Sequence, residues 1–166
     1  STPIKSSAAS DVYKRQAKHI GASDERLYRA LLVSDLVTIH QKTGIGRLSA
    51  YCGAVSAGCG AGAGIAYLLG GDYRAIAHTI VNAVAILSGT ICDGAKPSCA
   101  AKIASAVEAG ILGYYMYVND QQFRGGDGIV AKGVENTIRN VGLLASQGMK
   151  QTDRVILNIM TGDQCL

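Results

Sequence analysis

The run from Leu48 to Gly71 constrains the fold of this chain more than any other segment. It contains no charged residue and consists mainly of Gly, Ala and Ser, in the order LSAYCGAVSAGCGAGAGIAYLLGG. A helix with such small side chains lets neighbouring helices approach its backbone closely. Aromatic residues make up only 5% of the chain, which argues against an aromatic-rich sheet core. Prolines number only 2, so long segments carry no helix breaker, and the sequence predicts an all-α fold.

A second uncharged segment, Ala75 to Cys92, raises the alternative of a transmembrane hairpin. Gly60 and Gly64 form a GxxxG pair, which is typical of closely packed helices in membranes. The first run, however, is poor in the Leu, Ile and Phe residues that drive insertion. A buried pair of soluble helices is therefore the favoured interpretation, with no membrane partner. The odd count of 5 cysteines, without the spacing of a disulfide scaffold, and the absence of a secretory signal pattern point to the cytoplasm.

A chain of 166 residues is long enough for one domain with a sizeable core. Its apolar residues recur at helical spacing, as Leu27, Leu31, Leu32, Leu36 and Ile39 do in the first segment. Ser23 and Asp72 are suitable N-caps. We expect a compact domain of about six helices, over residues 23–42, 47–69, 72–88, 98–117, 129–146 and from 152 onward.

The net charge of +4 is unevenly distributed. Residues 1–16 (STPIKSSAASDVYKRQ) hold three cations against one acid, are Ser-rich and lack periodicity. We interpret them as a non-native leader, and residues 17–166 as the domain. The remaining charge is weak and scattered, with no run of Lys or Arg and no basic stripe interleaved with aromatics. Nucleic acid is therefore not an expected partner.

Three cysteines carry the main chemical signal. Cys92 and Cys99 bracket the loop CDGAKPSC, seven residues apart, and Cys52 lies forty residues before Cys92. This is not the spacing of a zinc site. Three thiolates could instead hold an iron–sulfur cluster and leave one iron open as a Lewis acid. From spacing alone the cluster is one option among several, since buried cysteines are also ordinary small apolar residues. Cys59, on the same helical face as Cys52, is expected to be such a packing residue.

Two long segments carry a family resemblance: GRLSAYCGAVSAGCGAGAGIAYLLGG (46–71) and TIVNAVAILSGTICDGAKPSCAAKIASAV (79–107). They closely resemble the L-cysteine desulfidase family, which is related to the α-domain of iron–sulfur L-serine dehydratases. The resemblance continues through DGIVAKGVENTIRNVG and GMKQTDRVILNIM, and covers about Lys18 to Met160. It implies a serine dehydratase α-domain-like helical fold that holds a 4Fe-4S cluster and uses no pyridoxal phosphate. Carried over residue by residue, the ligands would be Cys52, Cys92 and Cys99.

The resemblance also implies a reaction. A carbon–sulfur lyase of this family converts L-cysteine and water into pyruvate, ammonia and hydrogen sulfide. The seven-residue spacing of Cys92 and Cys99 resembles the desulfidases, whereas the L-serine dehydratases, the near alternative, have a longer gap here. From other classes, a membrane hairpin and a redox cluster protein with four protein ligands remain alternatives. Family members are much longer, and their proposed base lies in an N-terminal region absent here. We therefore expect a C-terminal, cluster-binding fragment with little turnover alone.

Three further residues are candidates for contact with the amino-acid substrate: Asn82, Asp93 and Lys96. Asn82 matches an asparagine of the related dehydratases, and Asp93 and Lys96 lie between two candidate ligands. The structural alternatives are an amide satisfied inside the helix bundle for Asn82 and loop capping for the other two. Cys165 is either a fourth thiolate at the open iron or a free exposed thiol near the C-terminus. A homo-oligomer is a further possibility that the sequence leaves open.

Overall fold

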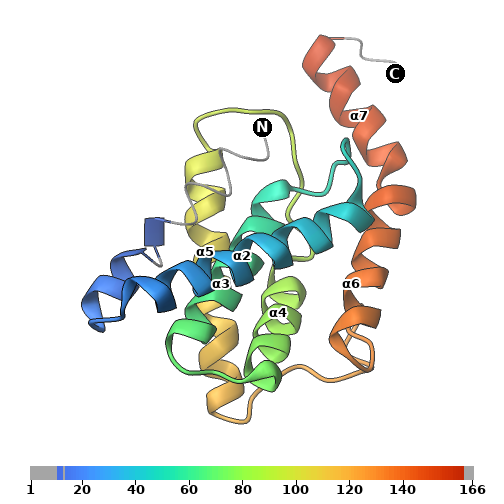
Figure 1. Cartoon of the computed structure of the whole chain (residues 1–166). Coiled ribbons are helices and arrows are strands. Elements are labelled where there is room, and N and C mark those ends of the chain that lie inside the picture. Colours follow the sequence, from blue (N-terminus) through green and yellow to red (C-terminus); the bar gives the residue numbers. More distant parts are fainter. Residues whose placement is uncertain (1–10, 13, 163–166) are drawn as a thin grey trace.

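The computed structural model describes residues 11, 12 and 14–162, and this part of the chain is all-helical, as predicted (Figure 1). Its one β feature is an isolated antiparallel bridge between Tyr51 and Ile91. The elements form a compact bundle, which confirms the expected domain of about six helices. They are α2 (Asp24–Ile45), α3 (Gly53–Leu68), α4 (Tyr73–Leu87), α5 (Cys99–Val118), α6 (Val134–Leu143), the π-helical turn η1 (Leu144–Gly148) and α7 (Lys150–Thr161).

Helix α3, which comes from the small-residue run, is the centre of the bundle. It packs against α2, α4 and α5, and nearly all of its residues are buried. Its glycines allow close helix packing on two opposite faces. Gly58 and Gly62 lie against Ala106 and Gly110 of α5, where a Cβ on Gly62 would stand 2.6 Å from the Gly110 Cα. Such a distance is shorter than a carbon–carbon contact tolerates, so the two backbones touch directly.

The opposite face of α3 meets α2 in the same way. Gly60 and Gly64 lie against Ser34 and Ala30, and a Cβ on Gly64 would stand 3.0 Å from the Ala30 carbonyl oxygen. The GxxxG pair thus packs α3 against α2. Among the described residues, no helix is both long and apolar enough to cross a membrane.

The buried face of α2 differs from the one that its leucines mark. The helix itself is confirmed, but Leu32, Leu36 and Ile39 are each more than 60% exposed, whereas Ala30 and Ser34 are buried. The physical reason is the close approach to α3: only small side chains fit between two backbones in contact. The apolar periodicity of this segment therefore indicates a helix but not its core face.

Two boundaries differ from expectation. Residues 46–52 are not the first turns of α3, because they form the bridge to residues 90–92 instead of continuing a helix. Residues 129–146 are helical only from Val134, and η1 interrupts the α-helical pattern before α7. Ser23 and Asp72 cap α2 and α4 as predicted, accepting hydrogen bonds from the backbone N–H groups of Arg26 and Ala75 at 3.3 and 2.9 Å.

The expected leader, residues 1–16, is described only at residues 11, 12 and 14–16, which are helical. Val12 packs against the apolar cluster that contains Ala17 and Ala30. Residues 1–10 and 13 lie outside the described part of the chain, and the leader remains a prediction.

The packing of α3 makes a direct prediction about stability. Gly62→Ala should lower the free energy of unfolding by about 1–3 kcal/mol, because the added methyl group has no space beside Gly110. Gly53→Ala, in the same helix but with nothing within 4 Å of its added Cβ, is the matched control and should leave stability unchanged or slightly raised. Urea unfolding of both variants measures the difference. Equal stabilities would contradict the proposed backbone contact.

Candidate functional site

The bridge between Tyr51 and Ile91 brings the two cysteine motifs together. The Cys52 N–H donates to the Thr90 carbonyl at 3.2 Å, and the Cys92 N–H donates to the Ala50 carbonyl at 2.6 Å. Ser49 anchors the first strand-like segment, because its hydroxyl donates to the Ala145 carbonyl and accepts from the Tyr51 N–H. Segments forty residues apart in sequence are thus fixed side by side, with Cys52 opposite Thr90 and Cys92 opposite Ala50, so that the two cysteines lie diagonally across the Tyr51–Ile91 pair.

The third cysteine is positioned by the register of two helices. The contacts of Gly58 with Ala106 and of Gly62 with Gly110 advance together along the chain, so α3 and α5 run parallel. Their N-termini therefore lie at the same end of the bundle. Cys52 is the N-cap of α3 and Cys99 is the first residue of α5, which places these two thiols at adjacent helix starts.

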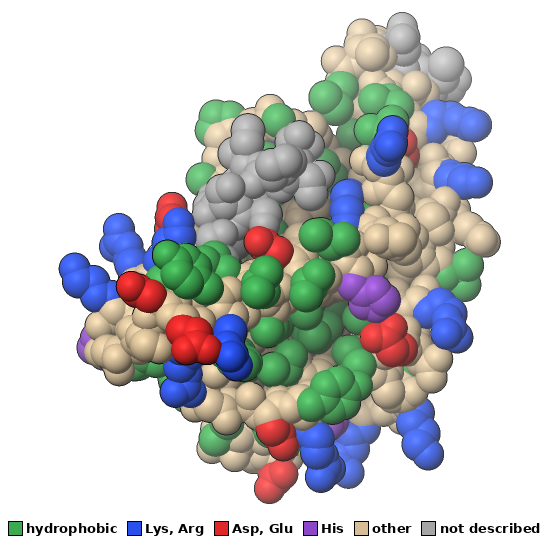
Figure 2. Space-filling model, viewed as in Figure 1, with side chains coloured by type: hydrophobic (Ala, Val, Ile, Leu, Met, Phe, Trp, Pro, Cys, Tyr) green, Lys and Arg blue, Asp and Glu red, His purple; other side chains and the backbone are tan. Residues whose placement is uncertain are grey.

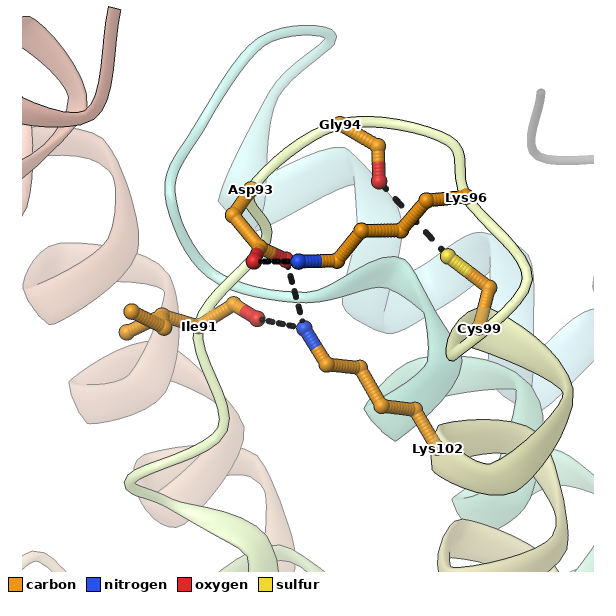
Figure 3. A network of polar contacts seen from close by, with 6 residues as sticks. All are labelled: Ile91, Asp93, Gly94, Lys96, Cys99 and Lys102. Carbon is orange, nitrogen blue, oxygen red and sulfur yellow. Dashed lines mark hydrogen bonds and ion pairs between the residues drawn. The ribbon is translucent and has the colours of Figure 1, made fainter. Parts of the chain in front are cut away.

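A small polar network holds the loop between Cys92 and Cys99 (Figure 3). The Asp93 carboxylate accepts hydrogen bonds from Lys102 at 2.7 Å and from Lys96, and Lys102 also donates to the Ile91 carbonyl at 2.9 Å. The Cys99 thiol points to the Gly94 carbonyl at 3.6 Å. Hydrogen bonds from Lys102 and Lys96 hold the pKa of Asp93 well below its usual range. The predicted pair Asp93 and Lys96 therefore lies together, joined by a residue that sequence reasoning missed.

Electrostatics at this end of the bundle favour anions. Helix N-termini carry a partial positive charge that stabilises thiolates, and both Cys52 and Cys99 stand at such ends. The Lys102 pKa is raised, first by its hydrogen bond to Asp93 and also by the charges of Cys52 and Cys99. One ammonium group thus interacts with two of the three candidate ligands.

The donor atoms of the three candidate ligands suit an iron–sulfur cluster, because soft thiolates are the ligands that such clusters require. Cys52, Cys92 and Cys99 are free of disulfides. In the described part of the chain, however, no three His, Cys, Asp or Glu side chains form a group that could hold a metal ion. The cluster and its ligands therefore remain a prediction.

A pocket of about 270 Å³ opens beside Cys92. Residues from three regions line it: the end of α2 and residues 47–53, the loop at Cys92 and Gly94, and the inner side of α7. Tyr51 lines the pocket but is almost wholly buried in the core, and its hydroxyl has no hydrogen-bond partner. Burial raises the pKa of Tyr51, and interactions with Cys59 and Cys52 add to the shift. The hydroxyl therefore lies in the core and does not face a ligand in the pocket.

The remaining predicted residues lie apart from this pocket. Asn82 is fully buried, donates to the Gly113 carbonyl at 2.9 Å and accepts from the Phe123 N–H at 2.9 Å. Its amide links α4, α5 and the following loop, and its contact with substrate remains a prediction. Cys59 is buried in α3, and burial raises its pKa to about 12, as befits a packing thiol. Cys165 lies outside the described residues.

Sequence reasoning missed several residues that line the pocket. Arg47, Tyr51 and Asp153 carry no motif signal, because they reach the site through the bridge and through the packing of α7. Lys102 could have been found from its position, since it lies one turn after Cys99 on α5 and so faces the same end.

Taken together, the described residues form an all-helical domain with a small pocket that is lined by one of the three candidate cysteines, Cys92. The model of the serine dehydratase alpha chain family matches residues 11–158, and the chain belongs to this family. The match begins within the stretch that we interpret as a leader. The resemblance of the sequence to this group of proteins is thereby confirmed at the level of the family.

Relatives come from several bacteria. A UPF0597 protein of Desulfitobacterium hafniense is 68% identical over 149 residues, which are 90% of this chain and 34% of that protein. UPF0597 proteins of Treponema denticola and Bacteroides fragilis are 51% and 44% identical, over 92% and 90% of this chain and 35% of each relative. The chain thus spans about a third of the length of these relatives. No solved structure matches it significantly.

The Asp93 network makes a prediction about pH. Because the folded-state pKa of Asp93 is depressed, its contribution to stability is present above its unfolded pKa of about 4 and is lost as the pH falls further. Asp93→Asn should therefore destabilise the chain at pH 7, and the difference from the parent should shrink at pH 3. Urea unfolding at both pH values tests this. Glu25→Gln, which removes an exposed pair with Arg29, is the control and should change stability little at pH 7.

Proposed function

We propose that this chain is the cluster-binding portion of an iron–sulfur L-cysteine desulfidase, a carbon–sulfur lyase of the serine dehydratase alpha chain family. The observations that support the proposal are the bridge at Tyr51 and Ile91, which holds the segments of Cys52 and Cys92 side by side, and the parallel register of α3 and α5, which puts Cys99 at the same end of the bundle. Membership of the family and the CDGAKPSC loop between Cys92 and Cys99 support it. A cytoplasmic location fits free thiols, which a reducing compartment preserves.

Cys52, Cys92 and Cys99 would hold the 4Fe-4S cluster, which supplies a Lewis acid at the iron that no protein thiolate binds. The chain already holds the three candidate ligands in an environment that favours a metal cluster. Helix N-termini at α3 and α5 and the Lys102 ammonium stabilise the negative charge of the thiolates. The Asp93 network fixes the loop that carries Cys92, so the ligands need little rearrangement on binding.

The pocket beside Cys92 has the charges that a zwitterionic amino acid requires. Arg47 provides a cation for the α-carboxylate and Asp153 an anion for the α-ammonium. Leu157 and Met160 of α7, both more than half exposed, add apolar surface to the pocket. A volume of about 270 Å³ accommodates a molecule as small as cysteine.

The reaction balances with water as the one further reactant. A base removes the α-proton, the bond between Cβ and sulfur breaks, and the sulfur leaves as hydrogen sulfide after gaining a proton. The resulting enamine becomes an imine, which water hydrolyses to pyruvate and ammonia. We assign the base to the two thirds of the longer relatives that this chain does not cover, so we expect the chain alone to turn over little.

An L-serine dehydratase is the second candidate, because the matching family carries that description. It would use the same pocket and eliminate water instead of hydrogen sulfide. The choice between L-cysteine and L-serine would therefore depend on the leaving group. The soft sulfur of cysteine and the hard oxygen of serine differ in their affinity for iron.

The cluster assignment is tested by anaerobic reconstitution. We expect about four iron and four sulfide per parent chain, the content that defines this cluster, and a strong loss in Cys92→Ser. Cys59→Ala is the matched control, because Cys59 is a buried packing thiol and its loss should leave the iron content unchanged. No iron in a folded parent chain, or equal iron in Cys92→Ser, would contradict the proposal.

Substrate preference is tested on the reconstituted chain by its visible spectrum. L-cysteine should shift the spectrum at lower concentration than L-serine, and Arg47→Gln should raise the half-saturating concentration at least tenfold, as for a lost charge-assisted hydrogen bond. Arg154→Gln, on α7 outside the pocket lining, is the control and should have no effect. A preference for L-serine would favour the dehydratase, and no shift with either amino acid would argue against substrate binding here.

A further inference from the structure

A second pocket, of about 320 Å³, lies at the far end of α4 from the cysteines. The first two turns of α4, residues 123–125 and residues 130–134 enclose it. Cys92, in contrast, follows the C-terminal end of α4. A helix of 15 residues is about 22 Å long, so the two pockets are separate sites.

Three cations line this second pocket: Arg74, Arg124 and Lys132. Figure 2 shows Lys and Arg side chains gathered at this lower edge of the molecule, where α4 and α6 begin in Figure 1. The ion pairs found in the described part of the chain all involve other residues. Cations that converge without an acidic partner repel one another, and a bound anion would relieve this repulsion.

Two further groups in the pocket are suited to an anion. Helix α6 starts at the pocket after Gly133, whose position has no capping side chain, so its first N–H groups are available. The His78 ring stacks on Tyr117, with 5.1 Å between ring centroids, and its Nδ1 atom is buried without a hydrogen-bond partner. Burial, followed by the positive charges of Arg74 and Arg124, lowers the pKa of His78. The positive charges of these two guanidinium groups therefore reach the imidazole of His78.

The rest of the pocket wall is apolar. Ala77 and Val81 of α4 face Val130 and Val134, and the rings of Tyr73 and Phe123 stand at the opening. Ligand sites commonly combine such an apolar wall with a few convergent polar groups. A lone inorganic ion would leave this wall unused, so an anion with an apolar body fits better.

We propose that this pocket binds a small phosphate monoester with an apolar or aromatic body. The phosphate would lie among Arg74, Arg124, Lys132 and the first N–H groups of α6, and the body would lie on Val81 and Phe123. Three cations and a helix N-terminus match a dianion better than a monocarboxylate. This site is independent of the proposed lyase chemistry, because it shares no lining residue with the cysteine pocket.

The composition of the chain offers a specific probe. Phe123 is its only phenylalanine, so incorporation of 4-fluorophenylalanine gives one fluorine resonance, located at this pocket. We expect phenyl phosphate to shift this resonance saturably. Inorganic phosphate, which lacks the body, and benzoate, which lacks the second charge, should each bind at least tenfold more weakly. No saturable shift with phenyl phosphate would overturn the proposal, and equal affinity for benzoate would overturn the assignment to a phosphate.

Substitutions of the lining cations test whether phenyl phosphate binds in this pocket. Arg74→Gln and Arg124→Gln should each weaken phenyl phosphate at least tenfold, whereas Arg139→Gln, a cation of α6 outside the pocket, should not. Circular dichroism and thermal unfolding establish that each variant is folded. Equal weakening in all three variants would show that the anion responds only to net charge, and unchanged affinity in Arg74→Gln and Arg124→Gln would place it elsewhere. Either result overturns the proposal.

Discussion

Direct backbone contact between α3 and its neighbours is the constraint on which the rest of this structure depends. Because Gly58 and Gly62 touch α5 with no side chain between them, the two helices have one possible register. The register makes them parallel, and their parallel direction brings both N-termini to one end. Cys52 and Cys99, each at the start of one of these helices, therefore lie at the same end of the bundle as the positive ends of both helix dipoles. The small residues that dominate the sequence thus determine the position of the site as well as the core.

The sequence predicted the helical class and the caps Ser23 and Asp72 because these depend on local chemistry: small residues, few breakers, and Ser or Asp at helix starts. It did not predict the pairing of residues 50–52 with 90–92, because two-residue bridges have no periodic signal and depend on tertiary contact. The exposed side of α2 was missed for a different reason. Leu36 follows the helical period, but close approach to α3 selects Ala30 and Ser34 for the buried side. Pattern reports where a helix is, whereas packing decides which face is inside.

The two ends of α4 differ in how their charges are compensated. At the cysteine end, Lys96 and Lys102 are both paired with Asp93, so the loop is held by ion pairs. At the other end, Arg74, Arg124 and Lys132 surround an apolar pocket without an acidic partner among the described residues. The first arrangement stabilises a loop geometry, and the second leaves electrostatic energy available to a ligand. The charged residues therefore hold a loop at one end of α4, and at the other end they are free to bind the proposed anion.

The geometry of the cysteine end also bears on the order of folding and cluster binding. In small zinc domains the metal supplies most of the folding free energy, because no core exists without it. Here Cys52 and Cys99 are placed by the α3–α5 core, and Cys92 by the hydrogen bond from its backbone N–H to the Ala50 carbonyl. None of these interactions requires a bound cluster. If the three cysteines hold a cluster as proposed, helix packing therefore supplies much of the organisation that its ligands need.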